Sequence, residues 1–235
     1  MAPRKGTLVP HKESRPAAGR NDTGDCMLNY AAIDASAVAT EPFPYFMAKS
    51  VLQRPELDAI QTDFPDVAGP GVFPLEELSC KGAFEQLVED IRSPELEAIL
   101  GRKFGIDLAD KPLMITVRGF CQKKDGRIHT DSTDKIVTCL LYLNDKWDNS
   151  GGRLRLLRKG DDLEDYLVEI PPNGGTFASF KVSNNSWHGH KPFVGQRRYV
   201  MFNWVKSEAA LTRQISRHKL SARIKKLIPF FYKGK

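Results

Sequence analysis

The sequence predicts an α+β protein in which a helical N-terminal part precedes a core of antiparallel strands and a basic helix closes the chain. Three observations favour this class. Apolar residues recur at helical spacing between about residues 42 and 100, short strand-like segments begin after Lys111-Pro112, and helical spacing returns after residue 206. About eight strand-like segments follow one another with no room for helices between them, so we expect an antiparallel sandwich or jelly-roll barrel.

Length and composition suit one main domain with attached helices, because the chain has 235 residues. No apolar run approaches the roughly 20 residues of a membrane-spanning helix, and the N-terminus lacks the apolar segment of a signal peptide. The cysteines show no CxxC spacing, which disfavours a disulfide framework and a cysteine-ligated zinc site. We therefore expect a cytoplasmic protein with reduced thiols.

The chain before the strands divides into two predicted parts. Residues 1–26 are rich in Pro, Gly, Lys and Arg and predict a disordered arm. Residues 27–111 predict helices that pack on the core. One helix is expected between Pro42 and Pro65, and another from about residue 81 to 100 with an interruption at Ser93-Pro94.

Positive charge is concentrated in the predicted C-terminal helix, residues 207–235. Residues 206–235 hold nine Lys/Arg and one acid, a balance of +8, which leaves −2 for residues 1–205 out of the total of +6. A nucleic-acid-binding role for the main domain is therefore disfavoured. Ser207 can cap the helix and Pro229 can end it. Its apolar stripe, made of Leu220, Ile224, Leu227 and Ile228, either packs on the domain or meets an anionic membrane or a partner.

The predicted strand core, residues 112–206, contains a candidate metal site. His129 and Asp131 lie two residues apart, so in an extended strand their side chains face the same way. A histidine from a distant strand would complete the two-histidine, one-carboxylate set that leaves positions open on non-haem iron. Strand parity gives His188 and His190 the same direction, so geometry alone does not choose between them.

The stretch from Leu113 to Val205 resembles the catalytic core of the prolyl 4-hydroxylase-like branch of the Fe(II)/2-oxoglutarate-dependent oxygenases. The matching features are the HTD triplet, the run IVTCLLYLND, the SGG turn, and a histidine followed four residues later by proline. The resemblance implies a double-stranded β-helix (jelly-roll) core, a bound Fe(II), 2-oxoglutarate as cosubstrate and O2. It also implies that His129, Asp131 and His188 are the catalytic metal ligands, since Pro192 follows His188 by four residues.

The same resemblance implies a basic residue that pairs with the far carboxylate of 2-oxoglutarate. Counting six residues back from Trp204 gives Arg198, which shares a strand face with Val200, Phe202 and Trp204. Some relatives have the basic residue nine positions after the histidine, which keeps Arg197 open. A guanidinium suits this role because its planar fork binds a carboxylate through two hydrogen bonds.

Three further residues are expected at the cosubstrate. Tyr142 occupies the family position whose phenol reaches the carboxylate, Thr138 faces the same way and can add a donor, and Leu154 resembles the residue that packs on the methylenes. Arg118, His190 and Trp204 are candidates for contact with the substrate. For Arg118 a solvated surface position is the alternative, and for His190 a supporting position beside the metal ligands.

The predicted function is a dioxygenase that hydroxylates a peptidyl, amino acid or small-molecule substrate while converting 2-oxoglutarate to succinate. The alternative is a non-catalytic metal-binding jelly-roll module that binds a sugar or a protein. A buried receptor for a carboxylate discriminates between them, because a structural metal site needs none. The substrate, the hydroxylated atom and the oligomeric state are left open by the sequence.

Overall fold

The computed structural model describes residues 26–67 and 69–226, with side-chain environments up to residue 217. The predicted disordered arm lies outside this part, apart from Cys26. Within the described residues, no helix combines the length and the apolar character needed to cross a bilayer.

Two antiparallel sheets form the centre of the molecule. One has six strands in the order β1-β7-β4-β9-β3-β2, and the other has three in the order β6-β5-β8. Every pairing between these strands is antiparallel. The strands are β1 (Tyr45–Ala48), β2 (Phe73–Pro74), β3 (Leu113–Cys121), β4 (Lys135–Tyr142), β5 (Leu154–Leu157), β6 (Tyr166–Ile170), β7 (Phe177–Lys181), β8 (His188–Gly189) and β9 (Gly195–Val205).

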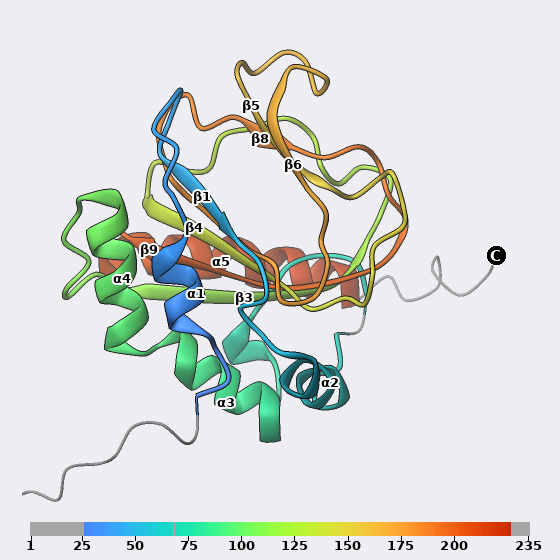
Figure 1. Ribbon diagram of the computed structural model, residues 1–235. Helices are drawn as coiled ribbons and strands as arrows, with labels where there is room; N and C mark the ends of the chain where they lie inside the picture. Colours follow the sequence, from blue (N-terminus) through green and yellow to red (C-terminus); the bar gives the residue numbers. More distant parts are fainter. Residues whose placement is uncertain (1–25, 68, 227–235) are drawn as a thin grey trace, which may run out of the picture.

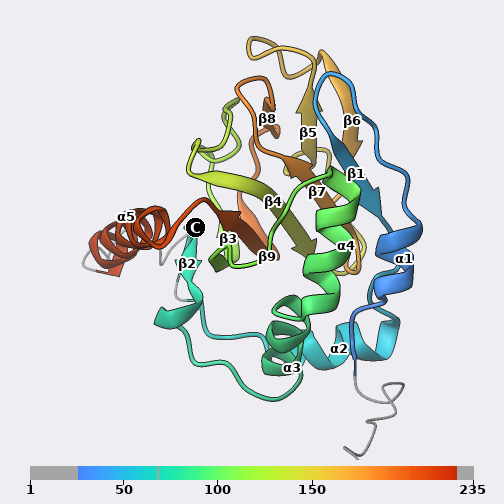
Figure 2. The ribbon, with the colours of Figure 1, turned by 90° about the vertical axis from the view of Figure 1, so that its left-hand side faces the viewer.

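Helices cover one face of the six-stranded sheet and the three-stranded sheet covers the other (Figures 1 and 2). The helices are α1 (Tyr30–Ala35), α2 (Arg54–Thr62), the short 3-10 helix η1 (Leu75–Glu77), α3 (Gly82–Ile91), α4 (Pro94–Phe104) and α5 (Glu208–Lys226). Local sequence sets the limits of α4: the Ser93 hydroxyl accepts from the Glu95 N–H, Pro94 occupies the first turn, and Gly105 ends the helix in the left-handed conformation at φ 59°.

The six-stranded sheet therefore has two buried faces. Toward the helices, apolar side chains such as Val137, Val200 and Phe202 join Phe84, Leu100 and other helix residues in one cluster. Toward the small sheet, a second cluster includes the side chains of Leu140, Tyr142, Leu154, Phe180 and Tyr199. Strands buried on both faces lose the simple alternation of apolar and polar residues, so the residue pattern of such a strand does not distinguish its two faces.

The predicted antiparallel α+β class is confirmed, and the two facing sheets are consistent with a jelly roll. Two local predictions were wrong. Residues 45–48, placed at the start of a helix, form β1 at the sheet edge, where Tyr45 pairs with Phe180. The segment around His129 is not a full strand, since it makes only an isolated bridge to His188. Edge pairing of β1 depends on a partner far along the chain, which local spacing does not reveal.

The first half of α5 contacts the loop that follows Asp131. The Ser207 hydroxyl accepts from the Ala210 N–H, as a helix cap. Arg213 forms an ion pair with Asp134 at 2.7 Å, and the buried Gln214 amide donates to Ser132 at 3.1 Å and to Asp134 at 3.0 Å. The predicted stripe at residues 220–228 lies outside the described side chains, so membrane or partner contact through it stays a prediction.

Candidate metal and cosubstrate site

Three side chains from two separate parts of the chain meet at the candidate metal centre. His129 and His188 exchange backbone hydrogen bonds, each N–H reaching the other's carbonyl at 3.0 Å. This bridge brings their imidazole rings to a centroid distance of 4.2 Å. With Asp131 they offer one ligand atom each, and these atoms all lie within 4.8 Å of one another. His190 is not part of this group, so the structure groups His188 rather than His190 with His129 and Asp131.

Both histidines are held in the tautomer that a metal requires. The Nδ1 atom of His129 lies 2.8 Å from the Arg127 carbonyl, and that of His188 lies 2.9 Å from the Ser186 carbonyl. A carbonyl only accepts, so Nδ1 carries the proton and the Nε2 lone pair is left for a metal. Burial lowers the pKa of His188 to about 4, which keeps the ring neutral near pH 7.

The Asp131 carboxylate is fixed by two other side chains. Lys135 pairs with one oxygen at 2.9 Å, and the Thr138 hydroxyl donates to the other at 2.5 Å. Burial by itself would raise the pKa of Asp131, but Lys135, His188 and Thr138 together hold that pKa below its usual value. The buried Asn203 amide donates to the Thr138 oxygen at 2.8 Å. The single hydroxyl proton of Thr138 is thus donated to Asp131, which corrects the expectation that Thr138 donates to the cosubstrate.

A cavity of about 260 Å³ adjoins the three candidate ligands. It is lined by charged residues, among them Lys135, Arg118 and Arg197, and by apolar ones including Leu140, Leu154 and Met201. Leu154, predicted to pack on the methylenes of the cosubstrate, lies on this wall and is 4% exposed. The cavity therefore combines carboxylate-binding cations with aliphatic surface.

Arg197 is a buried cation in the lining of this cavity. It is 2% exposed, and its Nε donates to the Gly152 carbonyl at 2.7 Å. A second nitrogen donates to the Tyr142 hydroxyl at 3.4 Å, and the guanidinium lies 5.2 Å and 5.0 Å from the ring centroids of Tyr142 and Tyr199. No carboxylate of the described residues pairs with Arg197. A buried cation without an acid calls for an anionic ligand.

Arg198, the first choice from the sequence, lies on the wrong face of β9. Its guanidinium stacks 4.8 Å from the Phe64 ring centroid in a surface recess beside Gly119. Parity correctly grouped Arg198 with Trp204, but that face packs against the helices, and Trp204 belongs to their apolar cluster. Neither residue lines the cavity, so the expected contact of Trp204 with a substrate is also corrected.

Tyr142, Arg118 and His190 are brought to the site. Tyr142 is fully buried behind Arg197, and burial raises its pKa to about 12, so the phenol keeps its proton. Arg118 lines the cavity and pairs with Asp125 at 2.7 Å, which excludes the solvated surface position. His190 also lines the cavity and is buried, with Nδ1 at 2.8 Å from the Lys191 carbonyl.

Sequence reasoning missed Lys135 and Asn203. Lys135 is 6% exposed and contacts Asp131 directly, while Asn203 is fully buried and supports Thr138. Lys135 opens an otherwise apolar strand four residues after the HTD aspartate, which is a signal that a partner carboxylate is close. Asn203 lies in an equally apolar strand, where a buried amide requires a hydrogen-bond partner.

Comparisons with known proteins agree with this geometry. The family model described as the 2OG-Fe(II) oxygenase superfamily matches residues 119–206, a stretch that contains the three candidate ligands and Arg197. A search of curated proteins finds no match.

Among solved structures, a prolyl-4-hydroxylase from Pseudomonas putida is similar at a TM-score of 0.52 and 15% identity, over 76% of this chain and 94% of that one. A viral collagen prolyl hydroxylase from Paramecium bursaria Chlorella virus-1 has a TM-score of 0.47 and 17% identity, over 69% of this chain and 96% of that one. The first likeness concerns the fold alone. Residues 119–206 are thus similar to the 2OG-Fe(II) oxygenase superfamily, and the fold of the chain is similar to that of a prolyl 4-hydroxylase.

Proposed function

We propose that this protein is an Fe(II)- and 2-oxoglutarate-dependent dioxygenase that hydroxylates a peptidyl, amino acid or small-molecule substrate. One observation carries the proposal: the candidate ligands His129, Asp131 and His188 share a cavity with Arg197, a buried cation that has no acidic partner among the described residues. A metal site and a carboxylate receptor in one cavity match the two ends of a 2-oxoglutarate molecule.

The residues present suit the cofactors that the superfamily needs, which are Fe(II), 2-oxoglutarate and O2. Two neutral imidazoles and one carboxylate are a donor set typical of non-haem Fe(II) with open positions. Arg197 presents the planar fork that binds a carboxylate, with Tyr142 beside it as a second donor. When bound, these cofactors supply oxidative decarboxylation of 2-oxoglutarate to succinate and CO2, coupled to hydroxylation of a substrate C–H bond.

Each side chain then has a separate task. His129 and His188 present Nε2 because the carbonyls of Arg127 and Ser186 hold their Nδ1 protons. Lys135 and Thr138 orient the Asp131 carboxylate and keep it ionised. Arg197 and Tyr142 receive the far carboxylate of 2-oxoglutarate, and Leu154 packs against its methylenes. The apolar wall of Leu140, Leu154 and Met201 limits the entry of water.

Anaerobic binding spectroscopy tests the proposal directly. Adding Fe(II) and then 2-oxoglutarate to the full chain should produce the weak visible charge-transfer band of the chelate, and admitting O2 should release succinate. His129→Ala and Asp131→Ala should abolish both signals. Wild-type protein that folds normally, yet gives neither a band nor succinate, would contradict the oxygenase function.

The non-catalytic alternative predicts a different response to the same experiment. A structural metal site would bind Fe(II) or Zn(II), but 2-oxoglutarate would change neither the spectrum nor the affinity for the metal.

A cytoplasmic location remains part of our proposal, and the feature that favours it is that all four cysteines are free thiols.

A further inference from the structure

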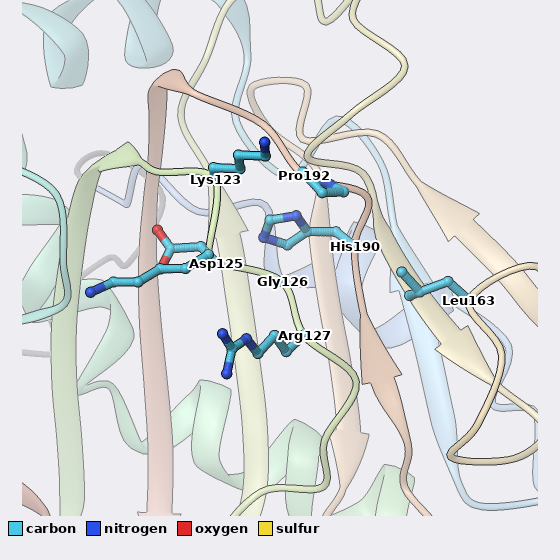
Figure 3. Close-up of a pocket in the computed structure, with 8 residues that line it drawn as sticks. Lys123, Asp125, Gly126, Arg127, Leu163, His190 and Pro192 are labelled. Atoms are coloured by element: carbon cyan, nitrogen blue, oxygen red, sulfur yellow. The ribbon is translucent and has the colours of Figure 1, made fainter.

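A groove opens beside the candidate active-site cavity (Figure 3). Its volume is about 470 Å³, and it shares Asp125, Gly126 and His190 with the cavity. The groove and the cavity therefore adjoin at this common wall.

The common wall is firmly held. The His190 N–H donates to the Gly126 carbonyl at 2.9 Å, and Asp125 is anchored by Arg118 at 2.7 Å. Gly126 has φ +85°, and a Cβ at this position would lie 2.3 Å from the His190 ring. Only glycine permits this backbone and this close approach. The groove is thus preformed.

Three cations on one loop give the groove its charge. Lys123, Lys124 and Arg127 line it and are exposed, and none of them pairs with an acid in the described part of the chain. The one acid on this wall, Asp125, is already paired with Arg118. In the adjoining cavity, the Nε atom of Arg118 is buried and lacks a hydrogen-bond partner among the described residues. The wall therefore presents uncompensated positive charge.

Among the described residues, no acidic side chain from the opposite side lines the groove, and Asp161 and Asp162, which precede Leu163, are not among its lining residues. The opposite side is built on the loop that carries Leu163, where acidic residues are neighbours in the sequence. Glu164 is paired with Arg155 at 2.9 Å and with Lys191 at 2.8 Å. Asp165 is paired with Arg158 at 2.9 Å.

We propose that this groove binds an acidic segment of a peptide substrate, and that the residue to be hydroxylated enters the cavity past His190. This inference rests on the proposed dioxygenase function and adds the substrate class. Figure 3 shows Lys123 and Arg127 on opposite sides of the His190 ring, so the cationic groups are spread along the groove. Separated charges suit several carboxylates on an extended chain, whereas a single anion needs donors that converge. Leu163 and Pro192 provide apolar contact for the aliphatic parts of such a chain.

Two labelled peptides test the proposal by fluorescence anisotropy. Both have 12 residues and the same proline content, one carries four Glu and the other four Gln, and both are titrated with the full chain holding Fe(II) and 2-oxoglutarate without O2. We expect the Glu peptide to bind about tenfold more tightly than the Gln peptide at low salt, the sum of several exposed charge pairs. The triple variant Lys123→Gln, Lys124→Gln, Arg127→Gln should lose this preference.

A matched control separates the groove from net charge. The variant Lys49→Gln, Lys81→Gln, Arg92→Gln removes the same number of exposed cations away from the groove and should keep the preference. The proposal is overturned if wild-type protein binds both peptides equally, or if the control loses as much affinity as the groove variant.

Two further arms test other anionic ligands. Displacement of the Glu peptide by inorganic phosphate at millimolar concentration would overturn the peptide assignment in favour of a single-anion site. Groove-dependent binding to anionic phospholipid vesicles without binding of the Glu peptide would overturn it in favour of a membrane surface. The chelate band is recorded on the same samples without peptide. If the band forms and the Glu preference is absent, only this inference fails; if no band forms, the proposed function fails.

Discussion

The two faces of β9 carry opposite roles within one strand. Toward the helices, Val200, Phe202 and Trp204 are part of an apolar cluster in which nearly every side chain is fully enclosed. Toward the small sheet, Arg197 and Tyr199 line a cavity beside the candidate metal ligands. The first face stabilises the fold by burying apolar surface, and the second presents polar groups to the cavity. Stability and function are thus separated by a one-residue step along the strand.

The largest expected effect lies on the helix-facing side. Phe202→Ala removes a fully buried ring and leaves a cavity between the sheet and the helices, so it should lower the free energy of unfolding by about 3–5 kcal/mol. Urea unfolding followed by circular dichroism measures this change. Met201→Ala, which truncates the half-buried neighbour on the other face, is the control and should cost clearly less. Equal losses of unfolding free energy in the two variants would contradict the assignment of stability to the helix-facing side.

The next effect concerns the cavity-facing side. Arg197→Ala should weaken 2-oxoglutarate binding by about 2–5 kcal/mol, because it removes a buried charged partner of the far carboxylate. Arg198→Ala should change that affinity little, since its guanidinium lies over Phe64. Titration of the anaerobic chelate band gives both affinities, and Arg197→Lys should fall between wild type and Arg197→Ala. If Arg198→Ala has the larger effect, the assignment of the faces is wrong.

Acid should destabilise the metal-free protein through the cavity-facing histidines. Burial lowers the pKa values of His188 and His190 from the ordinary 6.5 to about 4. Between these values the unfolded chain takes up protons that the native protein does not, so stability falls as the pH falls from 6.5 toward 4. The loss should be on the order of 3 kcal/mol for each ring. The pKa of Asp131 is held below its usual value, so its own contribution is lost only at still lower pH.

Urea unfolding in EDTA at a series of pH values measures this slope. His190→Gln should make the slope shallower by removing one of the two groups. A stability that stays flat or rises between pH 6.5 and 4.5 would show that these rings are not held neutral in the native protein.

The smallest effect should come from the hydroxyl beside Asp131. Thr138→Val keeps the shape of the side chain but removes its hydrogen bond to the carboxylate, so Fe(II) affinity should fall about tenfold. Thr138→Ser retains the hydroxyl and should bind Fe(II) nearly as wild type does. Anaerobic Fe(II) titration at saturating 2-oxoglutarate measures both. Unchanged Fe(II) affinity in Thr138→Val, together with weaker 2-oxoglutarate binding, would restore Thr138 as a direct cosubstrate contact.

Features encoded within a few residues could be predicted from the sequence. The break between α3 and α4 at Ser93-Pro94 follows from a hydroxyl cap and a proline, which act within one turn. His129 and Asp131 were predicted as neighbours because they lie two residues apart, even though the segment forms only a bridge to β8. Their grouping with His188 required the resemblance to a family, because spacing alone left His190 equally eligible.

The tertiary structure alone decided which face of β9 meets the cavity. Both faces of that strand are buried, so Arg197 and Arg198 each lie among large side chains. The alternation of residues along the strand therefore does not indicate which face lines the cavity. The contacts of Lys135 and Asn203 were decided in the same way, since their partners come from a loop and a neighbouring strand. Local sequence thus supplied candidate residues, such as His129, Asp131, Arg197 and Arg198. Packing of the helices on one face and the small sheet on the other determined which of them share a cavity, because burial on both faces hides that choice from the strand's own pattern.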